Sequence, residues 1–153
     1  MSSAISYRFL TAVQVKNLYT LHIARSSPTQ PAMLDSAINS PMNHKYYGQT
    51  DLFQLAGILA ERIILDHPYQ DGNKRTALYS ADMFLKINGY QLQSKPMAKN
   101  DIELNKGLAD AHVFVATSQW TSDDLGDYYR GIAPPLSDFN KEVRGYIEES
   151  VIY

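Results

Sequence analysis

The sequence of 153 residues, 44% of them hydrophobic and 20% charged, suits one globular domain that needs no metal or disulfide to stabilise its core. It contains no cysteine, which excludes disulfide frameworks, thiolate zinc sites and cysteine nucleophiles. The formal net charge of −2 provides no overall positive field, so nucleic acid is not an expected partner. The sequence has no apolar run of about 18 residues and no signal-peptide pattern, so we expect a cytoplasmic protein without a membrane partner.

The first predicted helix begins after Thr11. Thr11 and Gln14 have the spacing of a capping box, in which a hydroxyl and an amide side chain satisfy the free N–H groups of a helix start. Apolar side chains then recur every three or four residues, which predicts one buried face on a helix that runs to about Ile23.

The next segment is broken by proline. Residues 25–31 hold two prolines and two serines, a composition that interrupts helices. Residues 32–39 favour a short helix that stops before Pro41, since the residue before proline avoids helical angles. We expect an irregular, tyrosine-bearing loop over residues 43–49.

Two longer helices follow. Asp51 is a good N-cap for a helix that ends near Asp66, because Pro68 lacks a backbone N–H and pushes the preceding residue toward extended angles. After a loop, another helix starts around Asn73 and stops before Gly89, which can supply a left-handed C-terminal conformation.

The last part of the chain also favours helices. Asn100 and Glu103 form a second capping signature for a helix over residues 102–116, and Thr121 caps a shorter helix through Tyr129. Too few alternating segments occur to build a sheet. The prediction is therefore an all-α fold with small β excursions.

The tail after residue 135 differs in character. Phe139, Val143, Tyr146 and Ile147 are spaced as on one face of an amphipathic helix. We expect a single domain, with a core over about residues 7–132 and an appended tail over residues 136–153.

One segment goes beyond the requirements of folding: His-Pro-Tyr-Gln-Asp-Gly-Asn-Lys-Arg-Thr-Ala, residues 67–77, a loop that leads into a helix start. Helix N-termini present free N–H donors and a positive partial charge, so Gly72, Asn73 and Lys74 can bind phosphate through the backbone. Arg75 opposes the helix dipole in the first turn, but it can pair with phosphate oxygens. The segment therefore predicts a phosphate site.

Two further side chains of this segment suit phosphoryl chemistry. Asp71 offers a hard oxygen ligand of the kind that Mg²⁺ takes together with substrate phosphates. His67 can accept a hydroxyl proton near neutral pH. Outside this context each would have an ordinary structural role: a helix cap, a turn or a solvated face.

The segment resembles the signature of the Fic/Doc (Fido) family, H-x-F-x-(D/E)-G-N-G-R-x-x-R. The passages FLTAVQVKNLYTLH, MLDSAINSP and LYSADMFLKINGY are similar to the helices that flank this motif in Doc-type proteins. The resemblance extends over about residues 7–129. It implies an all-α Fido helical bundle with an ATP and Mg²⁺ site that modifies a protein hydroxyl.

The resemblance also implies roles for single residues. His67 would act as the base, Asp71 would hold Mg²⁺, and residues 72–75 would bind the nucleotide phosphates. A short β-hairpin flap would align the target segment. The predicted flap residues are Lys45, Tyr46, Tyr47, Gly48 and Gln49.

Two departures from the signature bear on the reaction. Lys74 replaces the second glycine and Leu78 the second arginine of AMP-transferring Fic enzymes, and both match the Doc branch. In that branch the inverted nucleotide presents its γ-phosphate, which implies a kinase acting on a serine or threonine hydroxyl. The alternatives are AMP transfer to a protein hydroxyl and a non-catalytic Fido module that binds a partner.

The resemblance suggests a toxin-like protein whose target is a translation factor. The inhibitory pattern (S/T)-x-x-x-E-(G/N) of many Fic proteins is absent from the sequence. Partners expected from the Doc resemblance are an antitoxin segment or a second copy of the chain. The amphipathic tail, residues 137–147, would fill the antitoxin groove in cis or mediate a dimer.

Overall fold

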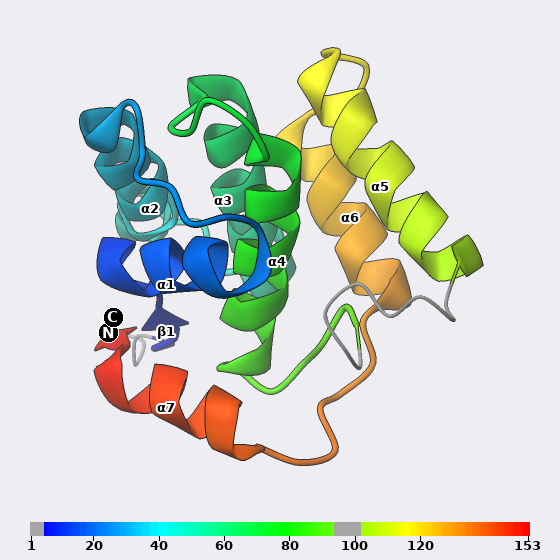
Figure 1. Ribbon diagram of the computed structural model, residues 1–153. Helices are drawn as coiled ribbons and strands as arrows, with labels where there is room; N and C mark the ends of the chain where they lie inside the picture. Colours follow the sequence, from blue (N-terminus) through cyan, green and yellow to red (C-terminus); the bar gives the residue numbers. More distant parts are fainter. Residues whose placement is uncertain (1–4, 94–101) are drawn as a thin grey trace.

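The computed structural model describes residues 5–93 and 102–153, the side chains of 102–105 excepted. Seven helices and one small sheet make up this part of the chain, which confirms the all-α prediction (Figure 1). None of the described helices combines the length and apolar composition needed to cross a bilayer. The helices are α1 (Ala12–His22), α2 (Pro31–Tyr46), α3 (Leu52–Asp66), α4 (Asn73–Lys86), α5 (Ile102–Ala116), α6 (Ser122–Ile132) and α7 (Lys141–Glu149).

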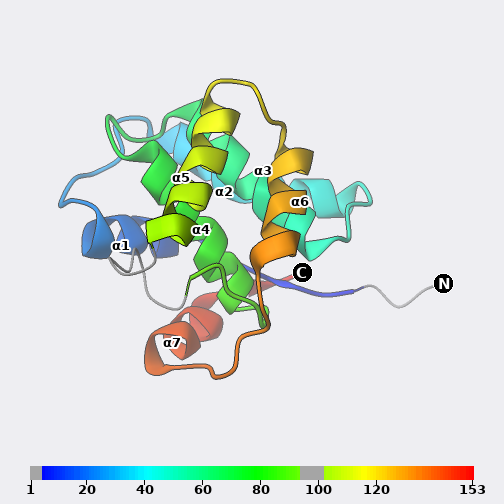
Figure 2. The same cartoon turned by 90° about the vertical axis from the view of Figure 1, so that its right-hand side faces the viewer.

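Helix α3 is the central element of the fold. It packs against α2, α4, α5 and α6 and is apolar on nearly every side, as expected of a helix surrounded by others (Figures 1 and 2). Its start is fixed by Asp51, whose carboxylate accepts hydrogen bonds from the backbone N–H groups of Phe53 and Gln54. Because α3 runs from this cap to His67, it sets the position of the conspicuous loop that follows.

Small residues allow α3 and α6 to approach closely. A Cβ atom added to Gly57 would lie 2.5 Å from the carbonyl oxygen of Ser122 and 2.9 Å from the backbone nitrogen of Gly126. The backbones of the two helices therefore touch at this crossing, and the space between them cannot admit a methyl group.

Helix α2 differs from its sequence prediction. It continues through Pro41 to Tyr46, whereas the sequence predicted an end before Pro41. An internal proline removes one helical hydrogen bond, but Leu34, Ala37, Ile38 and Pro41 form the buried face of this helix. Burial of that apolar face outweighs the cost of the lost helical hydrogen bond.

The predicted β-hairpin flap is not present at residues 45–49. Lys45 and Tyr46 complete α2, and Tyr47 and Gly48 form a turn, with Gly48 in the left-handed region (φ 113°). Residues 45–48 therefore do not adopt the extended backbone angles that a hairpin needs.

The sheet instead joins the two ends of the described chain. Strand β1 (Arg8–Phe9) pairs antiparallel with β2 (Val151–Ile152), with Phe9 opposite Val151 (Figure 1). Tyr7 and Tyr153 extend the pairing through two backbone hydrogen bonds of 2.9 Å. The segments that follow residue 135 are thereby fastened to the start of α1.

The tail forms the predicted amphipathic helix, α7, which starts at Lys141 behind an Asn140 cap. Val143 and Tyr146 turn into the hydrophobic core. The side-chain amide of Gln14 in α1 donates a 2.8 Å hydrogen bond to the Tyr146 carbonyl. The tail thus packs along α1.

Other local predictions are confirmed. Thr11 and Thr121 each form a complete capping box, and Gly89 has φ 96°. Helix α6 extends to Ile132, three residues beyond the predicted end. The predicted cap at Asn100 lies outside the described residues.

We predict that Gly57→Ala destabilises the protein by about 1–3 kcal/mol, because the added methyl group overpacks the α3–α6 crossing. Gly131→Ala is the matched control, since a Cβ at this position of α6 meets open space. The control should be neutral or stabilising by about 0.5–1 kcal/mol. Urea unfolding monitored by circular dichroism measures both, and equal effects would refute the close contact.

Candidate functional site

The site begins where α3 ends. His67 lies in the left-handed region (φ 48°, ψ 57°), which is uncommon for residues other than glycine, and its side chain is exposed. This conformation, followed by Pro68, turns the chain from α3 into the loop before α4. Backbone strain held in place by its surroundings is a feature of functional sites.

The loop between α1 and α2 forms hydrogen bonds to the backbone carbonyls of His67 and Pro68. Gln30 donates hydrogen bonds to the carbonyls of both residues, 2.9 Å from its side chain to His67 and 3.0 Å from its backbone to Pro68. The hydroxyl of Thr29 also donates to the Pro68 carbonyl at 3.5 Å. Residues 24–30 are therefore the loop beside the candidate catalytic histidine.

The residues predicted for the flap lie at the other end of α3 from His67. Residues 45–49 precede the first turn of α3, whereas His67 follows its last. Fifteen residues at 1.5 Å each separate these ends by about 22 Å. The loop beside His67 could be recognised from its composition, since residues 25–31 hold two prolines and two serines. Composition alone did not indicate that this loop contacts His67.

Asn73 holds the loop in shape. Its side-chain oxygen accepts a 3.0 Å hydrogen bond from the N–H of Tyr69, and its side-chain nitrogen donates a 2.7 Å bond to the Tyr69 carbonyl. We expected Asn73 to bind phosphate through its backbone, and the engagement of its carboxamide by the loop leaves that main-chain N–H unaffected. Any phosphate contact would use its main-chain N–H.

An aromatic stack between Tyr69 and Tyr19 of α1 supports the loop between α3 and α4. The rings of Tyr69 and Tyr19 are parallel within 4° with centroids 3.7 Å apart, and Tyr69 is 2% exposed. Burial raises the pKa of Tyr69 to about 12, so the phenol stays neutral. The Tyr19 hydroxyl also donates to the Asp71 carbonyl at 3.1 Å. Helix α1 thereby fixes the middle of the loop.

Gly72 is required at the start of α4. It has φ 79°, and a Cβ at this position would lie 3.0 Å from a methyl carbon of Ile23. The Gly72 carbonyl accepts hydrogen bonds from the Thr76 backbone N–H at 2.9 Å and from its hydroxyl at 2.8 Å. No side chain caps this helix, so the first-turn N–H groups of Asn73, Lys74 and Arg75 remain available to an anion.

Asp71, the residue predicted to hold a metal, lies directly beside that helix start. Its carboxylate is exposed, and one oxygen accepts a 2.9 Å hydrogen bond from the Gly72 N–H. Across the described residues, no three histidine, aspartate or glutamate side chains gather as a metal cage. A lone carboxylate next to a phosphate-binding helix end suits Mg²⁺, which keeps several waters and takes the remaining ligands from phosphates.

Two cationic side chains lie in the first turn of α4. Lys74 and Arg75 are both exposed in the first turn of α4. A guanidinium nitrogen of Arg75 donates a 3.4 Å hydrogen bond to the His22 carbonyl. Arg75 also hydrogen-bonds the Tyr79 phenol, which opposes the rise in the Tyr79 pKa caused by burial. Backbone donors and two positive charges thus converge on one helix end.

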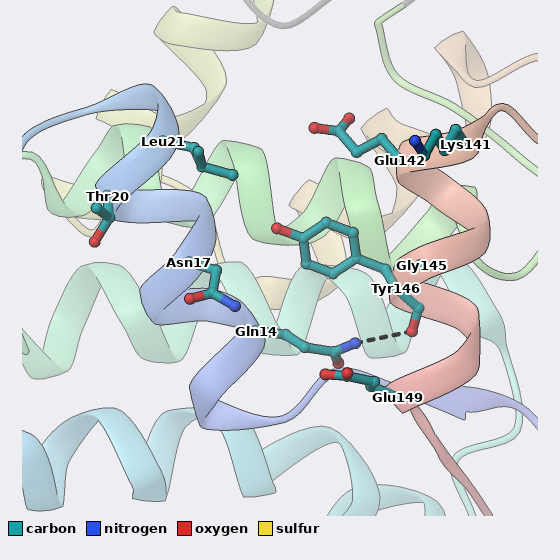
Figure 3. A pocket seen from close by; sticks show the side chains of 9 residues that line it. All are labelled: Gln14, Asn17, Thr20, Leu21, Lys141, Glu142, Gly145, Tyr146 and Glu149. Carbon is teal, nitrogen blue, oxygen red and sulfur yellow. Dashed lines mark hydrogen bonds between the residues drawn. The ribbon is translucent and has the colours of Figure 1, made fainter.

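A separate groove of about 650 Å³ lies between α1 and α7 (Figure 3). Leu21, Gly145 and Tyr146 give it an apolar floor, and Glu142 and Glu149 are its acidic residues. It contains none of the residues predicted for the site. Its acidic residues also make it unsuitable for a polyphosphate.

Comparisons with known proteins agree with this geometry. A family model described as Fic/DOC family matches residues 7–85, from β1 to the last turns of α4, including the whole loop. Over 81 residues the chain is 35% identical to the protein kinase doc of Escherichia phage P1. This match covers 53% of the chain and 56% of that relative, so the chain spans about half the length of the protein it matches.

Removal of the Asn73 carboxamide should loosen the loop. We expect Asn73→Ala to speed amide exchange at Tyr69 at least about tenfold and to cost about 1–3 kcal/mol, because two buried backbone groups lose their partner. Asn73→Asp keeps the acceptor for the Tyr69 N–H and should retain most of the protection. Hydrogen exchange measured by NMR tests both variants, and equal protection in the two would contradict the proposed clamp.

Proposed function

The chain belongs to the Fic/DOC family, and from this premise we propose that it is a protein kinase. It would transfer the γ-phosphate of ATP to a serine or threonine hydroxyl of a target protein. Proteins of this family generally use ATP with Mg²⁺, and a partial relative is named a protein kinase. The observation that carries the proposal is Lys74 at the uncapped start of α4, with Leu78 one turn later.

Each residue of the loop has a role in the proposed transfer. His67 accepts the proton of the target hydroxyl as its oxygen bonds to the γ-phosphorus. The bond from that phosphorus to the bridging oxygen of the β-phosphate breaks, and ADP leaves. Asp71 would hold the Mg²⁺ that offsets phosphate charge, while the N–H groups of residues 73–75 bind phosphate oxygens.

Lys74 and Leu78 favour γ-phosphate transfer over AMP transfer. Lysine occupies space that glycine would leave to the phosphates and adds a point charge at the helix start. Leu78 stands where AMP-transferring relatives have a second arginine, so the second guanidinium is absent from this helix. We propose that both changes place the nucleotide in the register that presents its γ-phosphate.

The target segment is proposed to lie along residues 24–30. This loop contacts His67 and Pro68, whereas residues 45–49 lie beyond the opposite end of α3. The target itself, an antitoxin and a second copy of the chain remain partners suggested by the Doc relationship. The tail, residues 136–153, is proposed as the surface that such a partner meets.

Incubation of the protein with Mg²⁺, cell lysate and ATP labelled at the γ- or the α-phosphate tests the reaction. We expect a labelled protein band from the γ label alone. His67→Ala should reduce this labelling by about 10²–10⁴-fold, because the base is lost. His44→Ala, at an exposed histidine near the end of α2, is the matched control and should retain full activity.

Label from the α-phosphate would overturn the kinase proposal in favour of AMP transfer. Lys74→Gly adds a test of orientation, because it removes the side chain held responsible for γ presentation. We expect this variant to lose γ selectivity. Unchanged γ selectivity in Lys74→Gly would show that Lys74 does not determine which phosphate is transferred.

A further inference from the structure

Arg75, one of the two cationic side chains at the start of α4, is held by groups on two helices. A guanidinium nitrogen donates a 3.4 Å hydrogen bond to the carbonyl of His22, in the last turn of α1. The guanidinium also hydrogen-bonds the phenol of Tyr79, one turn further along α4. A guanidinium has five donors, so these contacts order the side chain and still leave donors for an anion. Arg75 is therefore prepared to meet a phosphate group.

The side chain of His22 connects Tyr79 to the tail. The rings of His22 and Tyr79 are parallel within 14°, with centroids 5.0 Å apart. Nε2 of His22 lies 3.6 Å from a carboxylate oxygen of Glu142, in the first turn of α7. Figure 3 shows the Glu142 side chain extending from α7 toward the end of α1. Contacts thus run without a break from Glu142 through His22 and Tyr79 to Arg75.

This series of contacts is partly shielded from water. Tyr79 is 6% exposed, and the side chains of His22 and Glu142 are 21% and 39% exposed. Partly buried charges are screened less than exposed ones, so the Glu142 carboxylate can orient the His22 ring. The orientation of that ring in turn fixes the Tyr79 ring on which it stacks.

Helix α7 lies outside the part of the chain that the family model matches, residues 7–85. It nevertheless contacts α4 directly. The Asn140 cap and the buried side chains of Val143 and Tyr146 fix the turn that carries Glu142. The residue at the end of the series of contacts thus comes from a segment that the family motif does not include.

We propose that Glu142 is a positioning residue for Arg75 and acts through His22 and Tyr79. The inference rests on the proposed function, which it deepens by adding α7 to the phosphate site. Of the four residues, Arg75 alone would contact phosphate. The other three keep its guanidinium beside the free N–H groups in the first turn of α4.

The sign of the effect separates positioning from simple electrostatics. A carboxylate near an anion site repels the anion, so loss of the Glu142 charge by itself would strengthen phosphate binding. Loss of a positioning contact has the opposite effect, because the ligand must then order the Arg75 side chain at a cost in conformational entropy.

Binding of Mg²⁺-tripolyphosphate, measured by calorimetry, tests the positioning role without a transfer reaction. We expect Glu142→Gln to weaken binding about two- to tenfold, the cost of ordering one long side chain. Tyr79→Phe keeps the ring but removes the phenol that Arg75 contacts, and it should weaken binding to a similar extent. Arg75→Ala should weaken binding about tenfold or more, because a charge-assisted contact is lost.

A double variant shows whether Glu142 acts through Arg75. In the Arg75→Ala background, Glu142→Gln should have no further effect, because the side chain that Glu142 positions is gone. A role confined to the stability of α7 would not show this dependence on Arg75.

Glu149→Gln is the matched control. It removes the same charge from the same helix, and no ion pair in the described part of the chain involves Glu149. It should leave the affinity for tripolyphosphate unchanged or slightly higher. Thermal unfolding of each variant confirms that it is folded.

Three results would overturn the proposal. Glu142→Gln would bind tripolyphosphate at least as tightly as the unmodified protein, or it would behave like Glu149→Gln, or its effect would persist without Arg75. Absence of any tripolyphosphate binding by the unmodified protein would overturn the proposal together with the phosphate site.

These outcomes separate the positioning role from the reaction. Weaker binding in Glu142→Gln that depends on Arg75, without γ-labelling of any protein by the unmodified chain, would support the positioning role and reject the kinase. Labelling from γ-ATP together with unchanged tripolyphosphate binding in Glu142→Gln would support the kinase and reject the positioning role.

Discussion

The clamp that the Asn73 carboxamide forms around the backbone of Tyr69 is the interaction on which the site depends. It joins the first residue of α4 to the middle of the preceding loop through two hydrogen bonds, 3.0 and 2.7 Å long. Because the N-cap residue is Gly72, which has no side chain, the first turn of α4 stays uncapped. Its first-turn N–H groups thus stay without a side-chain partner beside Asp71, as the proposed anion site requires.

Helix α1 carries much of the support for this arrangement. Tyr19 stacks on Tyr69, Ile23 meets Gly72, and the His22 ring lies parallel to Tyr79 within 14° at 5.0 Å. Helix α7 of the tail also contacts α1. Glu142 of α7 approaches His22 at 3.6 Å, and Figure 3 shows the Gln14 side chain directed to the Tyr146 carbonyl. Segments distant in sequence thereby fix the geometry of the loop over residues 67–72.

Local rules predicted the features that depend on neighbouring residues. The capping box at Thr11, the caps at Thr121 and Asp51 and the start of α4 after its loop follow from side chains within a few positions. The missed features depend on tertiary contacts. Helix α2 passes Pro41 because its buried face packs on α3, and β1 pairs with a strand more than 140 residues away. Sequence spacing likewise did not show that Gln30 reaches the His67 carbonyl.

The central claim is that a nucleotide binds at the start of α4, with its phosphates at the free N–H groups. Backbone NMR during titration with Mg²⁺-ATP tests this directly. We predict the largest resonance shifts at residues 72–75, and Mg²⁺-tripolyphosphate should shift the same resonances. Shifts confined to the groove of Leu21 and Tyr146, or absent from the first turn of α4, would contradict the account.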